Sequence, residues 1–216
     1  MKNIFFTSLI AAIVSGMAPI LSAQWMPYGL NQSKTSNGSI ILADGANLFV
    51  GNNGGGVFRS LDSGATWTQV NSGLSDRNII ALAVNGSKLF AATDTAGIFI
   101  STNNGANWSV LTGWASSDRI TTFASLGTTL FLGTASSGAF RTTDDGTTWT
   151  LLGNGLTSQD ILALVSIGAN LFVSTHDANV FRSTDNGNTW INASQGLTKG
   201  ALEVLTTDGT DLFGAN

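Results

Sequence analysis

Short runs of apolar residues, separated by glycine and small polar residues, recur along most of this chain at one fixed period. Each repeat holds four such runs: the first is followed by a glycine, the second begins with Leu-Phe, the third carries a phenylalanine, and the fourth begins at a tryptophan. The tryptophans that mark the period are 41 residues apart, at Trp67, Trp108, Trp149 and Trp190. Runs of this length with a period of two predict β-strands.

Four short antiparallel strands in a unit of about 40 residues are typical of one blade of a β-propeller. The glycine after the first run suits a tight hairpin turn, because glycine tolerates a positive φ. The sequence therefore predicts an all-β propeller of about five four-stranded blades. The predicted blades lie near 37–70, 79–111, 120–152 and 161–193, with a partial last blade at 201–216 and an N-terminal strand at 24–30.

The turn between the third and fourth runs carries the pattern S/T-x-D-x-G-x-T-W, as in "GVFRSLDSGATW" at 56–67. The aspartate can accept hydrogen bonds from backbone N–H groups of its own turn, and the asparagine that replaces it in the second unit can do the same without charge. The glycine fits a strained turn position, and the tryptophan is expected to pack between blades. We expect a structural role for all of these residues: Asp62, Gly64, Trp67, Asn103, Gly105, Trp108, Asp144, Gly146, Trp149, Asp185, Gly187 and Trp190.

This motif resembles the Asp-box, or bacterial neuraminidase repeat, of a β-propeller superfamily. That superfamily includes sialidases, xyloglucan-hydrolysing glycosidases, sortilin-type receptors and photosystem II stability and assembly factors. The short, regular unit is most similar to the bacterial proteins related to the assembly factors, which are typically secreted. The resemblance implies a sialidase-like fold in which the boxes are structural, so it does not specify a function.

Both ends of the chain depart from the repeat. Residues 1–23 combine Lys2, an apolar stretch and a small residue before Gln24, a pattern typical of a secretory signal peptide, so we expect a secreted, periplasmic or cell-surface protein. The segment "QWMPYGL" at 24–30 resembles a fourth run, and the chain stops after two runs of its last unit. Two alternatives stay open: a five-bladed ring whose closing blade lacks its third run, or a fragment that forms the front of a larger propeller.

Composition excludes several classes of function. Nine basic residues against thirteen acidic ones leave no basic face for nucleic acid. With no cysteine and a single histidine, the chain offers neither disulfides nor a convincing metal site, and we expect no cofactor. After the signal peptide no segment is apolar for long enough to span a bilayer, so an integral membrane protein is not expected.

Candidate ligand-binding residues lie in loops on the face opposite the motif turns, where the repeats differ. Asp94 and His176 occupy the same repeat position, and Asp177 follows His176. The His-Asp pair could act as a base or ligate a metal, or it could be part of an exposed polar loop. Trp114 is the one tryptophan after residue 30 that is outside the repeat position, and it could stack on a sugar, anchor a protein partner, or replace leucine in packing.

The residues needed by sialidases are not available in this chain. Sialidases are known to use three arginines, a tyrosine nucleophile with a glutamate partner, and an aspartate acid. This chain has one tyrosine, Tyr28, and one glutamate, Glu203, and three of its arginines (Arg59, Arg141 and Arg182) share a repeat position that suggests a structural role.

The favoured hypothesis is a secreted, non-enzymatic scaffold that binds protein or glycan through its loops. A glycoside hydrolase using Asp94 and Asp177 is one alternative, since two carboxylates suffice for that chemistry. A fragment of a larger secreted cargo protein with a downstream sorting domain is another.

Overall fold

The structure is a computed structural model that describes residues 40–197 and 200–216. The expected signal peptide (1–23), the expected strand at 24–30 and Tyr28 lie outside these ranges. Within them every regular element is a β-strand, and no helix is long and apolar enough to cross a membrane.

The strands form four four-stranded sheets and one two-stranded sheet, and all pairs are antiparallel and sequential. We call the sheets blades 1 to 5. Blade 1 holds β1 (Ile40–Asp44), β2 (Asn47–Asn52), β3 (Gly56–Ser60) and β4 (Thr68–Gln69), and blade 2 holds β5 (Ile79–Asn85), β6 (Lys88–Thr93), β7 (Gly97–Ser101) and β8 (Ser109–Val110). Blade 3 holds β9 (Ile120–Leu126), β10 (Thr129–Thr134), β11 (Ala139–Thr142) and β12 (Thr150–Leu152). Blade 4 holds β13 (Ile161–Ile167), β14 (Asn170–Thr175), β15 (Val180–Ser183) and β16 (Ile191–Asn192), and blade 5 holds β17 (Val204–Thr207) and β18 (Leu212–Ala215).

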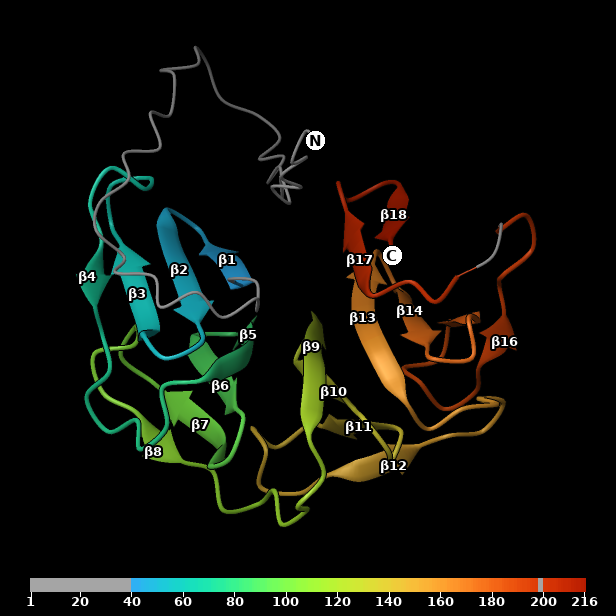
Figure 1. Cartoon of the computed structure of the whole chain (residues 1–216), viewed down its shortest axis with the longest axis horizontal. Coiled ribbons are helices and arrows are strands. Elements are labelled where there is room, and N and C mark those ends of the chain that lie inside the picture. Colours follow the sequence, from blue (N-terminus) through green and yellow to red (C-terminus); the bar gives the residue numbers. More distant parts are fainter. Residues whose placement is uncertain (1–39, 198–199) are drawn as a thin grey trace, which may run out of the picture.

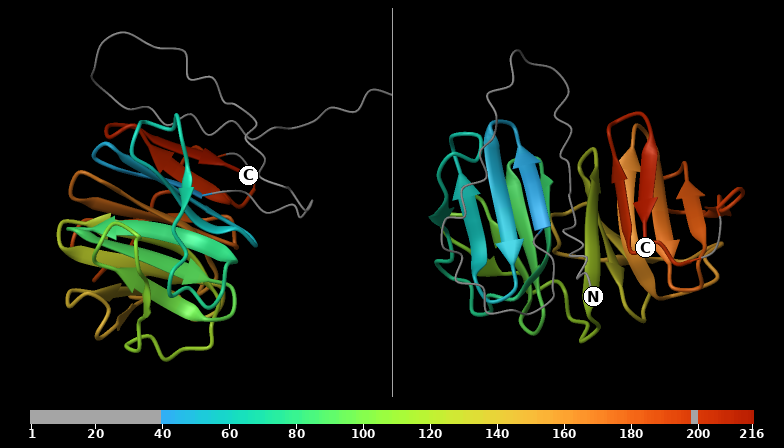
Figure 2. Two further views of the ribbon diagram at one scale, coloured as in Figure 1. Left: turned by 90° about the vertical axis from the view of Figure 1, so that its left-hand side faces the viewer. Right: turned by 45° about the horizontal axis from the view of Figure 1, so that its top comes forward.

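The blades lie face to face around a common axis, with their first strands innermost (Figures 1 and 2). The inner strands contact one another in chain order, from β1 through β5, β9 and β13 to β17. Blade 1 and blade 5 lie at the two ends of this arc (Figure 1). The predicted fold class, an all-β propeller of about five blades, is confirmed.

The core consists of three apolar clusters, and each fills the space between two successive blades. Phe49 of blade 1 packs with Phe99 of blade 2, Phe90 of blade 2 with Leu130 of blade 3, and Phe131 of blade 3 with residues of blade 4. Alternation along each strand produces this arrangement, because neighbouring residues point to opposite faces of the sheet and so to different neighbours. Burial of these faces is the main force that holds blade to blade.

The repeat tryptophans of blades 2, 3 and 4 pack toward the preceding blade. Trp108 and Trp190 are each 4% exposed and belong to the clusters that their blades share with blades 1 and 3. The indole Nε1–H of Trp108 also donates to the carbonyl oxygen of Val70 at 2.8 Å. Trp67 and Trp149 remain partly exposed.

Cationic side chains join the outer parts of neighbouring blades. Arg59 donates to the carbonyl oxygen of Asn104 at 2.9 Å, and Arg141 donates to that of Asn186 at 2.8 Å. Between blades 2 and 3 the arginine position is occupied by isoleucine, and there Lys88 instead pairs with the carboxylate of Asp145. Two of the three arginines in this repeat position thus have an architectural role, while Arg182 is exposed in blade 4.

Candidate functional site

The motif aspartates bind their own turns. Asp62 accepts hydrogen bonds from the backbone N–H of Thr66 at 2.8 Å, the hydroxyl of Thr66 at 2.6 Å and the hydroxyl of Ser60 at 2.7 Å. Asp144 and Asp185 accept the equivalent bonds from the residues at the same positions of their turns. Bonds from the threonine, and then from the serine or threonine before the aspartate, stabilise the ionised form and lower the pKa of each carboxyl to about 2.

The second unit builds the same turn without charge. The amide oxygen of Asn103 accepts from the backbone N–H of Asn107 at 2.9 Å and from the hydroxyl of Ser101 at 3.0 Å. In all four turns the residue before the motif glycine has a positive φ: Ser63, Asn104, Asp145 and Asn186. The repeated Asp, Asn and Gly residues are therefore occupied in forming the turns.

Two kinds of loop form the opposite edge of the blades, which we call the loop face. One kind connects the second and third strands within a blade, and the other connects one blade to the next. The backbone N–H of Asp94 donates to the carbonyl oxygen of Asn78 at 3.0 Å, and that of Ala135 donates to Arg119 at 2.9 Å. These bonds fix each within-blade loop to the connecting loop that enters the same blade.

Side chains reinforce these joints in blades 2 and 3. Asp76 accepts from the backbone N–H of Thr95 at 2.9 Å and from its hydroxyl at 2.7 Å. Asp118 accepts from the backbone N–H of Ser136 at 3.1 Å and from its hydroxyl at 2.8 Å. Burial, the largest single influence, raises the pKa of Asp118, but hydrogen bonds from Ser136 and neighbouring hydroxyls together outweigh it and lower the pKa to about 2. We call these two joints, with the one described next, the loop latches.

In the third loop latch, in blade 4, the carboxylate and the hydroxyl have changed places between the two loops. Here the connecting loop supplies the hydroxyl of Thr157, which donates to Asp177 of the within-blade loop at 2.9 Å. The hydroxyl of Thr175 also donates to Asp177, and this bond is the main reason that the pKa of Asp177 lies below its ordinary value. Asp177 was a candidate from the sequence, whereas Asp76 and Asp118 were missed; the available signal was an acidic residue two or three positions before the first strand of blades 2 and 3.

The other candidate residues of the loop face are distributed over separate blades. Asp94 lies in blade 2, where its exposed carboxylate pairs with the exposed guanidinium of Arg119 at 3.4 Å. His176 is exposed in blade 4, and its backbone N–H donates to the carbonyl oxygen of Asp160 at 3.1 Å. Blade 3 lies between Asp94 and Asp177, so the structure places these two carboxylates in different networks. In the described part of the chain no group of three or more His, Cys, Asp or Glu residues could hold a metal ion.

Trp114 is packed between blades 2 and 3. Its ring makes edge-to-face contacts with Phe140, at a centroid separation of 5.1 Å, and with Trp149, at 5.6 Å. It lies against the apolar cluster of these blades and is half-buried. This is the arrangement of the packing alternative, with only part of the ring left for contact with a ligand.

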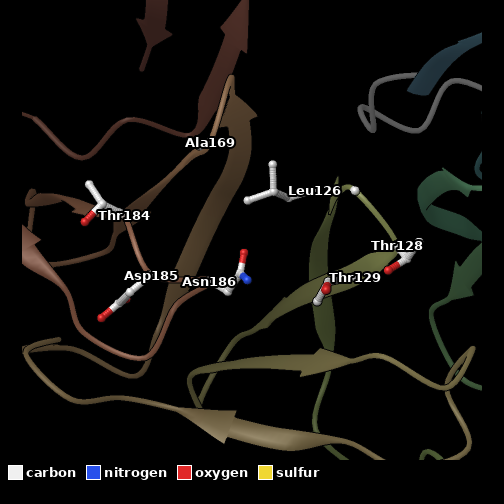
Figure 3. Close-up of a pocket in the computed structure, with 8 residues that line it drawn as sticks. Leu126, Thr128, Thr129, Ala169, Thr184, Asp185 and Asn186 are labelled. Carbon is white, nitrogen blue, oxygen red and sulfur yellow. The ribbon is translucent and has the colours of Figure 1, made fainter.

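A hollow of about 440 Å³ lies on the face of the motif turns, between blades 3 and 4 (Figure 3). It forms where the hairpin that joins β9 to β10 approaches the motif turn of blade 4. Thr129 and Asn186 stand here in the repeat positions that Lys88 and Asp145 fill one blade earlier, so no ion pair occupies the space. The lining residues are Leu126, Gly127, Thr128, Thr129, Ala169, Thr184, Asp185 and Asn186. The carboxylate of Asp185 accepts hydrogen bonds within its own turn, so it is not available to bind a ligand in the hollow.

Comparisons with known proteins identify the fold and no family. No protein-family model matches the chain, and neither does any curated protein. Among solved structures, the GH74 xyloglucanase from Xanthomonas campestris is 18% identical over 81% of this chain and 34% of its own, with a TM-score of 0.60. A structure described as YCF48 bound to D1 peptide is 16% identical over 85% of this chain and 63% of its own, with a TM-score of 0.62. YCF48 from Cyanidioschyzon merolae is 13% identical over 85% of this chain and 69% of its own, with a TM-score of 0.61.

These similarities establish a shared β-propeller architecture. The chain spans about a third of the xyloglucanase and less than two thirds of the peptide-bound YCF48. Because the same fold carries both hydrolases and binding proteins, the comparison by itself assigns no activity.

Proposed function

We propose that this chain is a non-enzymatic β-propeller scaffold that binds a protein partner through its loop face. The observation that carries the proposal is that the carboxylates of the loop latches are hydrogen-bonded and stabilised in their ionised form. Hydrogen bonds hold Asp76, Asp118 and Asp177 in the loop latches, and the pKa of each lies below its ordinary value. A glycosidase needs the opposite for its general acid, whose pKa is raised so that it can donate a proton near neutral pH.

The loop face has the features of a recognition surface. Its frame is fixed by backbone bonds and by the loop latches, and at one repeat position it presents Asn53, Asp94, Ala135 and His176 in successive blades. A rigid frame lowers the conformational entropy that is lost on binding. The side chains that differ from blade to blade on this frame can select a partner. The peptide-bound YCF48 structure has the same fold, which supports a protein as the partner class.

The proposal includes export and a structural role for the motif turns. The pattern of residues 1–23 supports secretion. The hydrogen bonds of Asp62, Asp144 and Asp185 within their own turns support the identification of these turns as Asp-boxes. The YCF48 structures support a relationship with assembly-factor-like propellers.

A photo-cross-linking experiment on the full chain would test the binding surface. A photoreactive amino acid replaces His176 on the loop face in one variant and Thr184 on the motif-turn face in the matched control. We expect the first variant to capture one protein from extracts of the source organism, and the purified partner to bind with at least about tenfold lower affinity after Asp94→Ala and His176→Ala. Capture from position 184 alone, or no capture from either position, would contradict the proposal.

Hydrolysis assays would test the competing enzymatic hypothesis. We expect no release of reducing sugar from xyloglucan and no release of sialic acid from sialosides. Hydrolysis that is abolished by Asp94→Asn or Asp177→Asn would establish a glycosidase and overturn the proposal. Melting temperatures of both variants are needed as a control, because Asp177 also holds a loop latch.

A further inference from the structure

One sheet face at the end of the arc is apolar and only partly covered. It is the face of blade 1 that points away from blade 2, and we call it the outer face of blade 1. It is formed by Ile41, Leu48, Val50, Phe58 and Trp67. Ile41 is 36% exposed, and the other four residues are half-buried.

The same repeat positions are fully buried in blade 2. Leu82, Leu89, Ala91, Phe99 and Trp108 lie one repeat after the outer-face residues, and all five belong to the apolar cluster that blade 2 shares with blade 1. The outer face of blade 1 therefore has the composition of a surface between blades. Apolar surface that stays partly accessible at the end of a stack of sheets is a candidate interaction site.

In blades 2 and 4, the repeat tryptophan binds the chain that leaves the fourth strand of the preceding blade. The backbone N–H of Trp108 donates to the carbonyl oxygen of Ser72 at 2.8 Å, and that of Trp190 donates to Asn154 at 2.9 Å. Each acceptor is followed by Gly-Leu, and both leucines, Leu74 and Leu156, pack against the cluster on that side.

Only glycine fits between the acceptor and the leucine. A Cβ on Gly73 would lie 2.0 Å from the carbonyl oxygen of Trp108, and a Cβ on Gly155 would lie 2.1 Å from that of Trp190. Both glycines also have a positive φ, of 91° and 97°. The tryptophan and its two neighbours thus recognise a short segment of the form polar residue, glycine, leucine, in which the backbones approach closely.

We propose that Tyr28-Gly29-Leu30 is the segment that covers the outer face of blade 1. In this arrangement the backbone N–H of Trp67 would donate to the carbonyl oxygen of Tyr28, Gly29 would lie against the carbonyl group of Trp67, and Leu30 would pack on the apolar face. Tyrosine would take the acceptor position that Ser72 and Asn154 fill for Trp108 and Trp190. This is compatible because the acceptor is a backbone group.

The length of the connection permits this contact. Nine residues, 31–39, join Leu30 to Ile40, whereas six residues, 75–80, join Leu74 to Ala81, which is the counterpart of Ile40 one repeat later. A segment tethered this close to its site has a high effective concentration, which favours it over a free partner or a second copy of the chain. The contact would also keep the apolar face from associating with other chains.

Amide hydrogen exchange on the full chain would test this assignment. We expect the N–H of Trp67 to be protected to a degree similar to that of Trp108. Gly29→Ala would lower the protection of the Trp67 N–H at least about tenfold and leave that of Trp108 unchanged. Gly73→Ala is the positive control, because it should lower the protection of the Trp108 N–H.

Gly196→Ala is the matched negative control. Gly196 precedes leucine in the same motif and has a φ of 86°, but no atom lies within 4 Å of its added Cβ, so neither amide should change. If Gly29→Ala prevents folding, which loss of protection at Trp108 would reveal, Leu30→Ser supplies the same test with less strain. An unprotected Trp67 N–H in the unmodified chain, protection unaffected by Gly29→Ala and Leu30→Ser, or protection that rises with protein concentration would overturn the proposal, and the last result would assign the face to a second copy.

Discussion

At the scale of single residues, the motif aspartate acts through contacts that lie within a few positions along the chain. The hydroxyl of Ser60 binds Asp62 and also accepts from the backbone N–H of Gly64 at 2.8 Å, while Thr66 donates twice to the carboxylate. Every partner lies within four residues of the aspartate, so the turn is encoded locally. Asn103 shows that the geometry needs an acceptor oxygen at this position but not a charge.

The charged turns should make stability depend on pH in a narrow acidic window. In the folded chain the pKa values of Asp62, Asp144 and Asp185 are about 2, against an ordinary value of 3.8. Because the folded carboxyls bind fewer protons than the unfolded ones in this range, their stabilisation is complete above about pH 4 and is lost as the pH falls toward 2.

Urea unfolding between pH 2 and pH 6 would measure this effect. Asp144→Asn should make the fall of the unfolding free energy between pH 4 and pH 2 less steep, because it removes one of the carboxylates whose pKa folding lowers, a set that also includes Asp76, Asp118 and Asp177. Asn103→Ala is the control: it should lower the unfolding free energy by a similar amount at every pH, since Asn103 carries no titrating group. An unchanged slope in Asp144→Asn would show that the pH dependence arises elsewhere.

At the scale of elements, the loop latches show how two loops distant in sequence are held together. Asp118 and Ser136 belong to different loops, as do Thr157 and Asp177, and in each pair one carboxylate meets one hydroxyl. Blades 3 and 4 place the carboxylate on opposite partners, so the interaction is kept while the residues that make it are exchanged. Asp177 therefore has a structural role. Asp94 and His176 lie at a repeat position whose residue differs from blade to blade.

A double-mutant cycle on Thr157→Val and Asp177→Ala should detect this coupling. We expect a coupling free energy of about 0.5–1.5 kcal/mol, below the roughly 1.5–3 kcal/mol usual for a hydrogen bond to a charged group, because this pair is exposed to solvent. It should change little with salt, because one partner is neutral. The Arg119–Asp94 pair, which is exposed, serves as the comparison: its coupling should be below about 1 kcal/mol and should decline at high ionic strength. A coupling free energy near zero for Thr157 and Asp177 would show that this latch does not stabilise the loop face.

At the scale of the whole molecule, stability depends on contacts between neighbouring blades. Each apolar cluster joins one blade to the next, and the cationic contacts of Arg59, Lys88 and Arg141 follow the same rule. A chain built in this way behaves approximately as a row of units with nearest-neighbour interactions. Blade 3 has a neighbour on both sides, whereas blade 5 presents Val204 and Phe213, which are 46% and 48% exposed.

Amide exchange across the molecule should therefore show a gradient. We expect the amides of β17 and β18 to exchange at least about tenfold faster than those of β10, because opening blade 5 exposes less new apolar surface than opening blade 3. Mass spectrometry of peptides from each blade would measure the difference. Equal protection in blades 3 and 5 would instead indicate that the described blades open as one cooperative unit.

The sequence alone was sufficient for the features that depend on neighbours along the chain. The 41-residue period placed the strands and the motif turns, because alternation, turn residues and their hydrogen bonds act over a few positions, as in Asp62 with Thr66. The same period predicted a structural role for the arginines of one repeat position, which holds for Arg59 and Arg141, and it supplied the fold class that the structure confirms.

Tertiary structure alone decided which side chains meet across blades and loops. It placed Trp114 against Phe140 and Trp149, engaged Asp177 with Thr157, and revealed Asp76 and Asp118 as latch residues. These contacts depend on how closely successive sheets approach and on which loop faces which, and neither property has a periodic signal in the sequence. The repeat determines the strands and turns of each blade. The packing of one blade on the next determines which of its polar residues remain available to bind a partner.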